Sequence, residues 1–587
     1  MMEHKTSFPN QVKNQPPTNG GAAFRRLRHL KMDREPGRTL NLFQTILRFC
    51  RDAAFFTFAA LDFGLSAGAP GPVAGEIMRD VRTSARISEA TLLLLATLAV
   101  FGALVFWLAR KPSGQAAPKT AGPPLVLYCA AGIKTPVEDI VAEYAREQGG
   151  RVQLQYGGSQ TLLAGLEVAR RGDLYLPADE DYLAMARRKG LVAESIPAAR
   201  MTAVLAVRRG NPKAIRSLDD LLAPGIALAQ ANPEAAAVGR ITRAALRQSG
   251  HWEALEKKTR VFKPTVHDVA NDLKLGTVDA GFIWDAMLKQ YPELEVVALP
   301  QLAGAAALIS VGVLAGSDQP TEALRFARFL TATDRGQRQF AQAGYVPAGG
   351  DPWAPVPELR LMAGAMLRPA IEETIKQFEK REGVRITRVY NGCGILVAQM
   401  RTGDRPDAYF SCDNSFMAQV ADLFQGTEEI SSNPMIILTQ KGNPKGLKTL
   451  EDLGRPGLRV GLAHEQQSAL GALTKNLLLA VGCYEPVRKN LAVESATGDF
   501  LVNQLRVGSL DAVVVYTSNA AAVQDAAEAL PINHPSAFAI QPIAVGKQAR
   551  YPQLAARFQQ AVRTAESRQR FLSLGFGWEL RAPAEPR

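Results

Sequence analysis

An internal repeat constrains the fold of this 587-residue chain more than any other feature. The stretch that begins at Leu125 and the stretch that begins at Leu359 share one pattern. Each has a short apolar strand, a turn of small residues, an amphipathic helix and a second strand. Further matching pieces follow in the same order, among them RGNPK with KGNPK and VDAGFIWDA with LDAVVVYTSNA. A fixed order of matching segments is the mark of a duplicated structural unit.

The spacing between landmarks supports two complete copies. Tyr128 and Trp284 lie 156 positions apart, and Leu361 and Tyr516 lie 155 apart. Chance similarity would not hold its register over such distances. We therefore expect a first module at 124–348 and a second at 358–580, joined by a segment rich in proline and glycine.

Each copy alternates strands with helices, which predicts an α/β module with a mainly parallel sheet. Apolar runs such as LVLYCAA and AVLAV suit strands that are buried on both faces. At roughly 225 residues, one copy is long enough for two lobes.

An apolar segment precedes the repeat. Residues 90–109 carry no charge and match the ~20 residues that cross a ~30 Å hydrocarbon core. Positive charge is in excess on the N-terminal side, which predicts an inside N-terminus and exported modules. We expect an uncleaved, single-pass anchor in the inner (cytoplasmic) membrane, with the modules in the periplasm or extracytoplasmic space. Residues 110–123, rich in Pro, Gly and Ala, are expected to be a flexible linker.

Residues 1–89 form a basic and largely disordered segment, by expectation. Met78 begins a compact signal-anchor pattern, so we expect the true start there and regard 1–77 as an upstream extension. The chain has a net charge of +12, of which the first 89 residues supply +5. The remainder shows no basic stripe, so nucleic acid is not an expected partner.

Cysteines and motifs argue against a metal site or an enzyme. The five cysteines show neither C-x-x-C spacing nor a zinc-like pattern with histidine. We expect them to be mostly free and buried, although one bridge, for instance Cys393 to Cys412, stays open if the compartment oxidises. No serine-hydrolase, zinc-protease, Walker or dinucleotide signature occurs. The expectation is no catalytic residue, no cofactor and no metal.

Each copy resembles the periplasmic substrate-binding proteins of ABC transporters, type II fold, and most closely their molybdate/tungstate-binding branch. The resemblance is carried by AAG after the first strand, GGSQTL after the second, GDLYLPAD, RGNPK and VDAGFIW. It implies two α/β lobes per module, with a ligand cleft between them. It also implies capture of a tetrahedral oxyanion for uptake through ABC permease and ATPase subunits.

The resemblance further implies an anion held by neutral donors: hydroxyls and backbone N–H groups in turns that lead into helices. The family usually has Ser at the first turn, where this chain has Gly132 in the first copy and Ala365 in the second. Trp284 stands where the family has Tyr, and Cys393 stands where it has Ser. Carried over by position, the expected ligand-binding residues are Gly132, Ser159, Val238, Val266 and Trp284 in the first copy, and Ala365, Cys393, Ser468, Gly498 and Tyr516 in the second.

Several alternatives stay open. Ser159 could be only a helix cap, Cys393 a buried filler, and Trp284 and Tyr516 core aromatics. The ligand could be another oxyanion or a small organic anion. The protein could also be an extracytoplasmic sensor or regulatory binding protein with no transport role, in which case a partner protein would carry the output.

Overall fold

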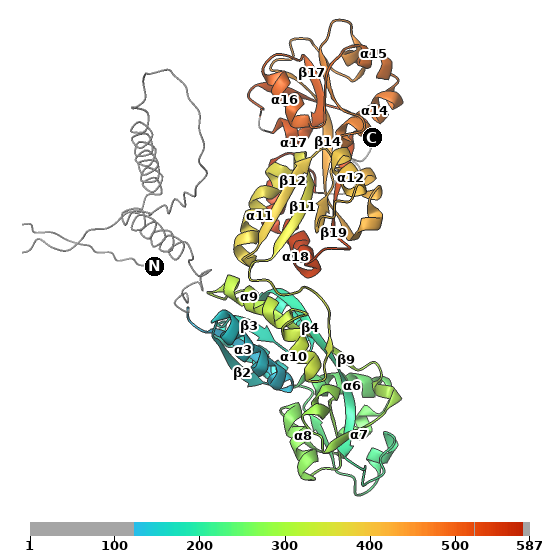
Figure 1. The fold of residues 1–587 in the computed structure, drawn as a ribbon. Coiled ribbons are helices and arrows are strands. Elements are labelled where there is room, and N and C mark those ends of the chain that lie inside the picture. The colour runs from blue at the N-terminus through green and yellow to red at the C-terminus, as the bar shows by residue number, and fades with distance from the viewer. Residues whose placement is uncertain (1–121, 522, 579–587) are drawn as a thin grey trace, which may run out of the picture. The chain divides into compact units, whose positions relative to one another are not determined.

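Two α/β modules follow one another along the chain in the computed structural model, which describes residues 122–521 and 523–578 (Figure 1). The expectation of two tandem α/β modules is confirmed. The expectation of a mainly parallel sheet is wrong, because the long central strand of each module and its neighbours pair antiparallel, so each sheet is mixed. The expected anchor at 90–109, the linker and the basic segment before it lie outside the described residues. Within the described part of the chain, no helix is both long and apolar enough to cross a membrane.

The strands of both modules are arranged in the same order. The first module has the order β2-β1-β3-β9-β4-β7-β5-β6, and the second has β12-β11-β13-β19-β14-β17-β15-β16. The bounds in the first module are β1 Leu125–Ala130, β2 Val152–Gly157, β3 Leu174–Leu176, β4 Val192–Arg208, β5 Leu228–Ala231, β6 Thr259–Lys263, β7 Ala280–Trp284, β8 Leu294–Val297, β9 Ala306–Leu314 and β10 Val346–Pro347. Those in the second are β11 Glu358–Gly364, β12 Arg385–Asn391, β13 Ala408–Phe410, β14 Phe424–Gln440, β15 Val460–Ala463, β16 Leu491–Ser495, β17 Ala512–Tyr516, β18 Ala527–Pro531 and β19 Phe538–Gly546.

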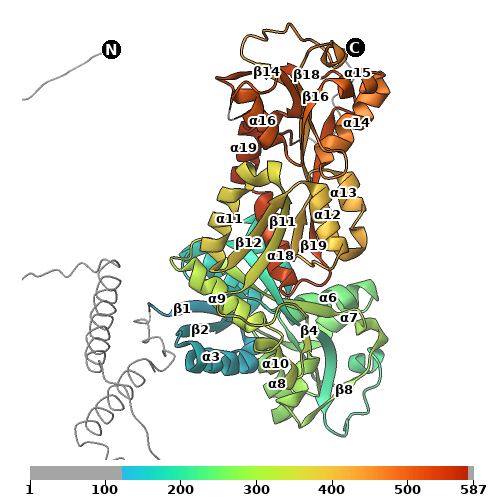
Figure 2. The same cartoon turned by 45° about the horizontal axis from the view of Figure 1, so that its top comes forward.

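Helices connect the strands and cover the sheets; α11 and α12, for example, lie on either side of β11 and β12 in both views (Figure 2). The helices of the first module are α3 Lys134–Gln148, α4 Ser159–Ala169, α5 Glu180–Arg188, α6 Ala237–Gln248, α7 Trp252–Lys258, α8 Val266–Leu275, α9 Pro320–Thr331 and α10 Gly336–Gln342. Those of the second are α11 Arg368–Glu382, α12 Cys393–Arg401, α13 Asn414–Ala418, α14 Ala469–Val481, α15 Tyr484–Lys489, α16 Gly498–Arg506, α17 Thr517–Ala520, α18 Pro552–Val562 and α19 Ala565–Ser573.

One long strand in each module runs through both lobes. In β4, the residues up to Thr202 pair with β9, and those from Ala203 pair with β7. In β14, Pro434 pairs with β19 and Met435 pairs with β17. The change of partner within a single strand divides each module into two lobes and marks a crossing segment between them.

Local sequence explains the matching helix ends. Both α3 and α11 have 15 residues and end at a glycine with a left-handed backbone, Gly149 at φ 69° and Gly383 at φ 66°. Glycine favours this conformation because it lacks a Cβ. The strands β7 and β17 are buried at every position, as their uninterrupted apolar sequences predict.

A buried ionic cluster joins the two modules. Glu382, at the end of α11, accepts hydrogen bonds from Arg328 of the first module and Arg557 of the second, with N···O distances of 3.0 and 2.7 Å. The Glu382 side chain is only 2% exposed. Burial would raise the pKa of its carboxyl, but the two guanidinium groups hold that pKa below its usual value. The junction between the modules therefore contains a buried ionic cluster of one carboxylate and two guanidinium groups.

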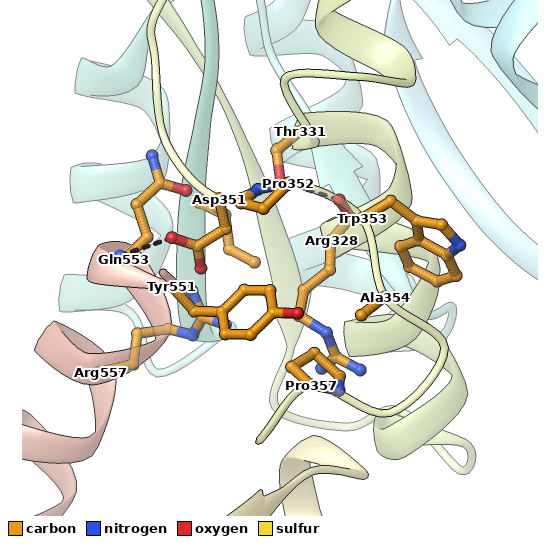
Figure 3. A pocket seen from close by; sticks show the side chains of 11 residues that line it. Arg328, Thr331, Asp351, Pro352, Trp353, Ala354, Pro357, Tyr551, Gln553 and Arg557 are labelled. Atoms are coloured by element: carbon orange, nitrogen blue, oxygen red, sulfur yellow. Dashed lines mark hydrogen bonds between the residues drawn. The ribbon is translucent and has the colours of Figure 1, made fainter. Parts of the chain in front are cut away.

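Figure 3 shows a small pocket beside this cluster. Residues of both modules line it, including Arg328, Asp351, Tyr551 and Arg557. The Asp351 carboxylate accepts the backbone N–H groups of Gln553 (2.8 Å) and Leu554 (2.9 Å) in the first turn of α18. An acidic group at a helix N-terminus is favourable, so the connecting segment is fixed to the second module at this point.

Candidate functional site

The cleft of the first module contains a small cavity, of which about 20 Å³ is open to the centre of a water-sized sphere. The N-terminal ends of α4, α6 and α8 and the short 3-10 turn Ala131–Ile133 meet there. All five residues expected in this copy line it: Gly132, Ser159, Val238, Val266 and Trp284. The structure thus brings together five residues that are spread over more than 150 positions of the sequence.

The described residues that line this cavity include no charged side chain. Its polar character comes from Ser159, Thr265, the Trp284 indole and the backbone of the converging turns. Helix N-termini present unpaired N–H groups and the positive end of the helix dipole. The arrangement is suited to a small anion held by neutral donors.

Ser159, the first residue of α4, is buried and placed by two hydrogen bonds. Its Oγ accepts the Ala178 N–H at 3.1 Å, and its carbonyl accepts the Tyr175 hydroxyl at 2.7 Å. The Ala178 N–H uses one lone pair of Oγ, so the hydroxyl hydrogen can point to a ligand in the cavity. Two hydrogen bonds to residues outside α4 therefore fix the position of Ser159, whereas a residue that only caps a helix bonds to its own helix.

Gly132 is closely packed against the opposite wall. A Cβ at this position would lie 3.1 Å from Val266 Cγ1 and 3.2 Å from Trp284 Nε1. The Gly132 carbonyl accepts the hydroxyl of Tyr345 at 2.7 Å. Burial raises the pKa of Tyr345, so this phenol stays a neutral donor and fixes the turn. The sequence predicts no role for Tyr345, because it is a single aromatic residue 213 positions away from Gly132 and belongs to no motif.

The two lobes of the first module are closed over the cavity. The Gln160 N–H of one lobe donates to the Ala235 carbonyl of the other at 3.1 Å. A Cβ on the neighbouring Gly158 would overlap that same carbonyl oxygen. Closure therefore depends on a glycine at the start of α4.

An ion pair also connects the two lobes of the first module. Arg240 on α6 pairs with Asp179, the N-cap of α5, and with Asp181 at 2.9 Å. The Arg240 guanidinium lies over the ring of Tyr182, 5.2 Å from its centroid. Neither Arg240 nor its pairing was anticipated, because the partners lie on helices of different lobes.

The second module repeats the arrangement with different side chains. Strand pairing makes Leu127 equivalent to Leu361, since they face the matching strands β3 and β13. The position of Gly132 is then taken by Met366, and Ala365 corresponds to Ala131. The Met366 thioether lies 3.7 Å from Asn433 Nδ2 on β14, beside the point where that strand changes partner.

The remaining expected residues of the second copy lie at the same junctions as their counterparts. Cys393 begins α12, Ser468 is the N-cap of α14, Gly498 begins α16 and Tyr516 ends β17. The register of the equivalent strands shows that Ser468 corresponds to Ala236 of the first module rather than to Val238. The Tyr516 hydroxyl is buried and has no hydrogen-bond partner among the described residues. Whether any of the ten residues contacts a ligand stays a prediction.

Fold and site together define a two-lobed binding module with a cleft lined by helix N-termini, present twice. The chain belongs to the bacterial extracellular solute-binding protein family, whose model matches residues 125–346 and 359–577. The resemblance found in the sequence is thereby confirmed, with two copies in tandem.

Individual relatives match about one module's length. A putative binding protein of Haemophilus influenzae is 29% identical over 225 residues, which are 38% of this chain and 91% of that protein. The molybdate-binding protein ModA of Mycobacterium tuberculosis is 30% identical over 224 residues, 37% of this chain and 83% of that protein. A solved periplasmic molybdate-binding protein of Azotobacter vinelandii is 18% identical, with a TM-score of 0.33, over 38% of this chain and 98% of that one.

Proposed function

We propose that the protein is a membrane-anchored, extracytoplasmic receptor that captures a tetrahedral oxyanion such as molybdate or tungstate for uptake by an ABC transporter. The observation that carries this proposal is the cavity between the two touching lobes of the first module. It is small, has no charged lining residue among those described, and is surrounded by helix N-termini. No step of bond making or breaking is part of the proposal.

The cavity size favours a small ion. Only about 20 Å³ of it is open to the centre of a water-sized sphere, far below the roughly 300–1,000 Å³ of pockets for drug-sized ligands. A hydrogen bond to a charged group contributes about 1.5–3 kcal/mol, so several neutral donors together can offset the loss of hydration of a small anion. The Ser159 hydroxyl, the Trp284 indole N–H and backbone N–H groups are the donors available around this cavity.

The composition of the lining also favours fully ionised anions. A protonated anion such as hydrogen phosphate needs an acceptor for its own hydrogen. The described residues around the cavity include no carboxylate that could take it. Molybdate, tungstate and sulfate have no such hydrogen at neutral pH, and we expect the cleft to prefer them.

A thermal-shift series on the full chain tests this function. Molybdate, tungstate, sulfate and phosphate would each be titrated against the purified protein, since a ligand of the native state raises the melting temperature. We expect molybdate, tungstate and sulfate to stabilise the protein and phosphate to have little effect. Stabilisation by none of molybdate, tungstate and sulfate would contradict the proposal.

The proposed membrane anchor and the proposed transporter partners need separate tests. Membrane fractionation of the native protein, with and without high salt, should leave it in the membrane fraction. Co-purification should recover permease and ATPase subunits. Release of the protein as a salt-extractable species would contradict the anchor, and the binding proposal would stand unaffected.

A further inference from the structure

Two positions that touch in the first module are both cysteine in the second. In the first module, Ser159 Oγ accepts the N–H of Ala178 at 3.1 Å. In the second, Cys393 Sγ accepts the N–H of Cys412 at 3.0 Å. Cys393 and Cys412 are thus the structural counterparts of Ser159 and Ala178, and both are buried.

A third substitution makes room for the two sulfur atoms. Gly364, at the end of β11, stands where the first module has Ala130. A Cβ on Gly364 would overlap Cys412 Sγ and lie 3.2 Å from Cys393 Sγ. Both thiols therefore face the same point of the backbone, and only glycine leaves space for them there. This combination of three changes argues against Cys393 as a simple filler.

The surroundings of the pair make the two thiols unequal. Burial would raise the pKa of Cys393, but hydrogen bonds from the Cys412 thiol and N–H, and from the hydroxyls of Tyr409 and Ser411, lower it. The hydrogen bond to Cys393 and burial raise the pKa of Cys412. One sulfur is thus stabilised as a thiolate while its neighbour keeps a proton, which is the asymmetry of a nucleophilic and a resolving thiol.

We propose that Cys393 and Cys412 form a redox-active dithiol in the cleft of the second module. The Cys393 thiolate attacks a small-molecule or protein disulfide, forms a mixed disulfide and displaces one thiolate. The Cys412 sulfur then attacks Cys393 Sγ, the second thiol leaves, and the proton of Cys412 passes to it. Starting from the Cys393 thiolate and the Cys412 thiol, the protein loses two electrons and one proton, and the external disulfide is reduced to one thiolate and one thiol. The thiolate displaced in the first step takes its proton from water.

Access to the pair requires the lobes to open. Cys393 begins α12, where the next residue, Gly394, donates its N–H to the Gln467 carbonyl of the other lobe at 3.0 Å. A metal is a poorer fit than a disulfide, because the described residues contain no group of three or more His, Cys, Asp or Glu side chains placed to hold one. The inference stands independently of the proposed anion, since neither sulfur needs a ligand to react.

Peptide mapping by mass spectrometry tests the pair in the folded, full-length protein. After exposure to oxidised glutathione, we expect a disulfide-linked peptide containing Cys393 and Cys412, and its loss after dithiothreitol. Cys483→Ser is the control, because this buried thiol belongs to neither cleft position. It should leave the linked peptide unchanged.

Single substitutions separate the two roles. Cys412→Ser should accumulate a stable glutathione adduct on Cys393, whereas Cys393→Ser should leave Cys412 largely unmodified. The double substitution Cys393→Ser, Cys412→Ala copies the first module and provides a folded reference without the pair. Free Cys393 and Cys412 after oxidation, a link that forms only in denaturant, or thiols masked until a chelator is added would each overturn the proposal.

Discussion

Gly158 has space for no side chain in the closed first module, because a Cβ would overlap the Ala235 carbonyl oxygen of the opposite lobe. Its backbone, at φ −67°, is one that alanine adopts readily. Gly158→Ala should therefore leave each lobe folded and hinder closure over the anion. We expect oxyanion affinity to fall about 10-fold or more, equivalent to about 1.4 kcal/mol, in a calorimetric titration.

The same helix offers a matched control. Gly165 lies within α4, and a Cβ there would meet nothing within 4 Å. Gly165→Ala should keep the affinity and raise helix stability by up to about 1 kcal/mol. Equal affinity in the two variants would show that closure at Gly158 does not contribute to binding.

Ser159→Ala removes the one hydroxyl that α4 directs to the cavity and also the acceptor of the Ala178 N–H. Loss of a donor to a charged ligand, at about 1.5–3 kcal/mol, predicts an affinity about 10- to 100-fold weaker. Ser310→Ala is the control, since the Ser310 hydroxyl lies on β9, is buried and has no hydrogen-bond partner within the described part of the chain. Isothermal titration of both variants decides the matter, and unchanged binding by Ser159→Ala would remove this residue from the site.

The cleft of the first copy could be predicted from sequence, and that of the second only in part. Motifs such as GGSQTL contain glycine and serine at recognisable positions, so Ser159 and its neighbours could be placed by spacing. The strands LVLYCA and LRLMAG contain no such marker. The two sequences can therefore be aligned equally well in either of two registers that differ by one residue. The strand pairing fixes the alignment of the two copies and shows that Met366, rather than Ala365, is the structural equivalent of Gly132.

At the scale of elements, α5 and α6 are joined across the first cleft by the pairing of Asp179 with Arg240. The Arg240 side chain is 30% exposed, so we expect no more than about 1 kcal/mol from this pair. Arg240→Met should weaken the closed state and speed anion release by up to about fivefold in stopped-flow measurements. The effect should shrink at high salt, because salt screens exposed charges.

Arg243→Met is the corresponding control on α6. Arg243 pairs with Glu234, which belongs to the same lobe, so its loss does not affect closure. A release rate increased equally by both substitutions would mean that Arg240 acts through the stability of α6 instead. Helix ends such as Gly149 could be predicted from sequence, whereas this ion pair could not, because its partners are 61 residues apart on separate helices.

At the scale of the whole molecule, Glu382 holds Arg328 of the first module and Arg557 of the second. Glu382→Gln leaves two buried guanidinium groups without their anion, which typically costs about 3–5 kcal/mol. We expect a clear fall in the melting temperature of the full chain by calorimetry. Glu373→Gln on the same helix replaces a half-exposed carboxylate and should change it little.

Acid should weaken the same junction. The pKa of Glu382 lies below its ordinary value of 4.5 in the folded protein, so its stabilisation is complete above that value. The stabilisation is lost as the pH falls further, through the lowered pKa, when the carboxyl takes up a proton. Calorimetry from pH 7 down to pH 3 should show a steeper loss in the wild type than in Glu382→Gln. Parallel pH profiles would argue against this role.

Isothermal titration of the full-length protein with molybdate tests the central claim most directly. The wild type should bind with saturable heat, Gly165→Ala should match it, and Gly158→Ala should bind at least about 10-fold more weakly. Absence of binding by the wild type, for molybdate, tungstate and sulfate alike, would contradict an oxyanion cleft in the first module.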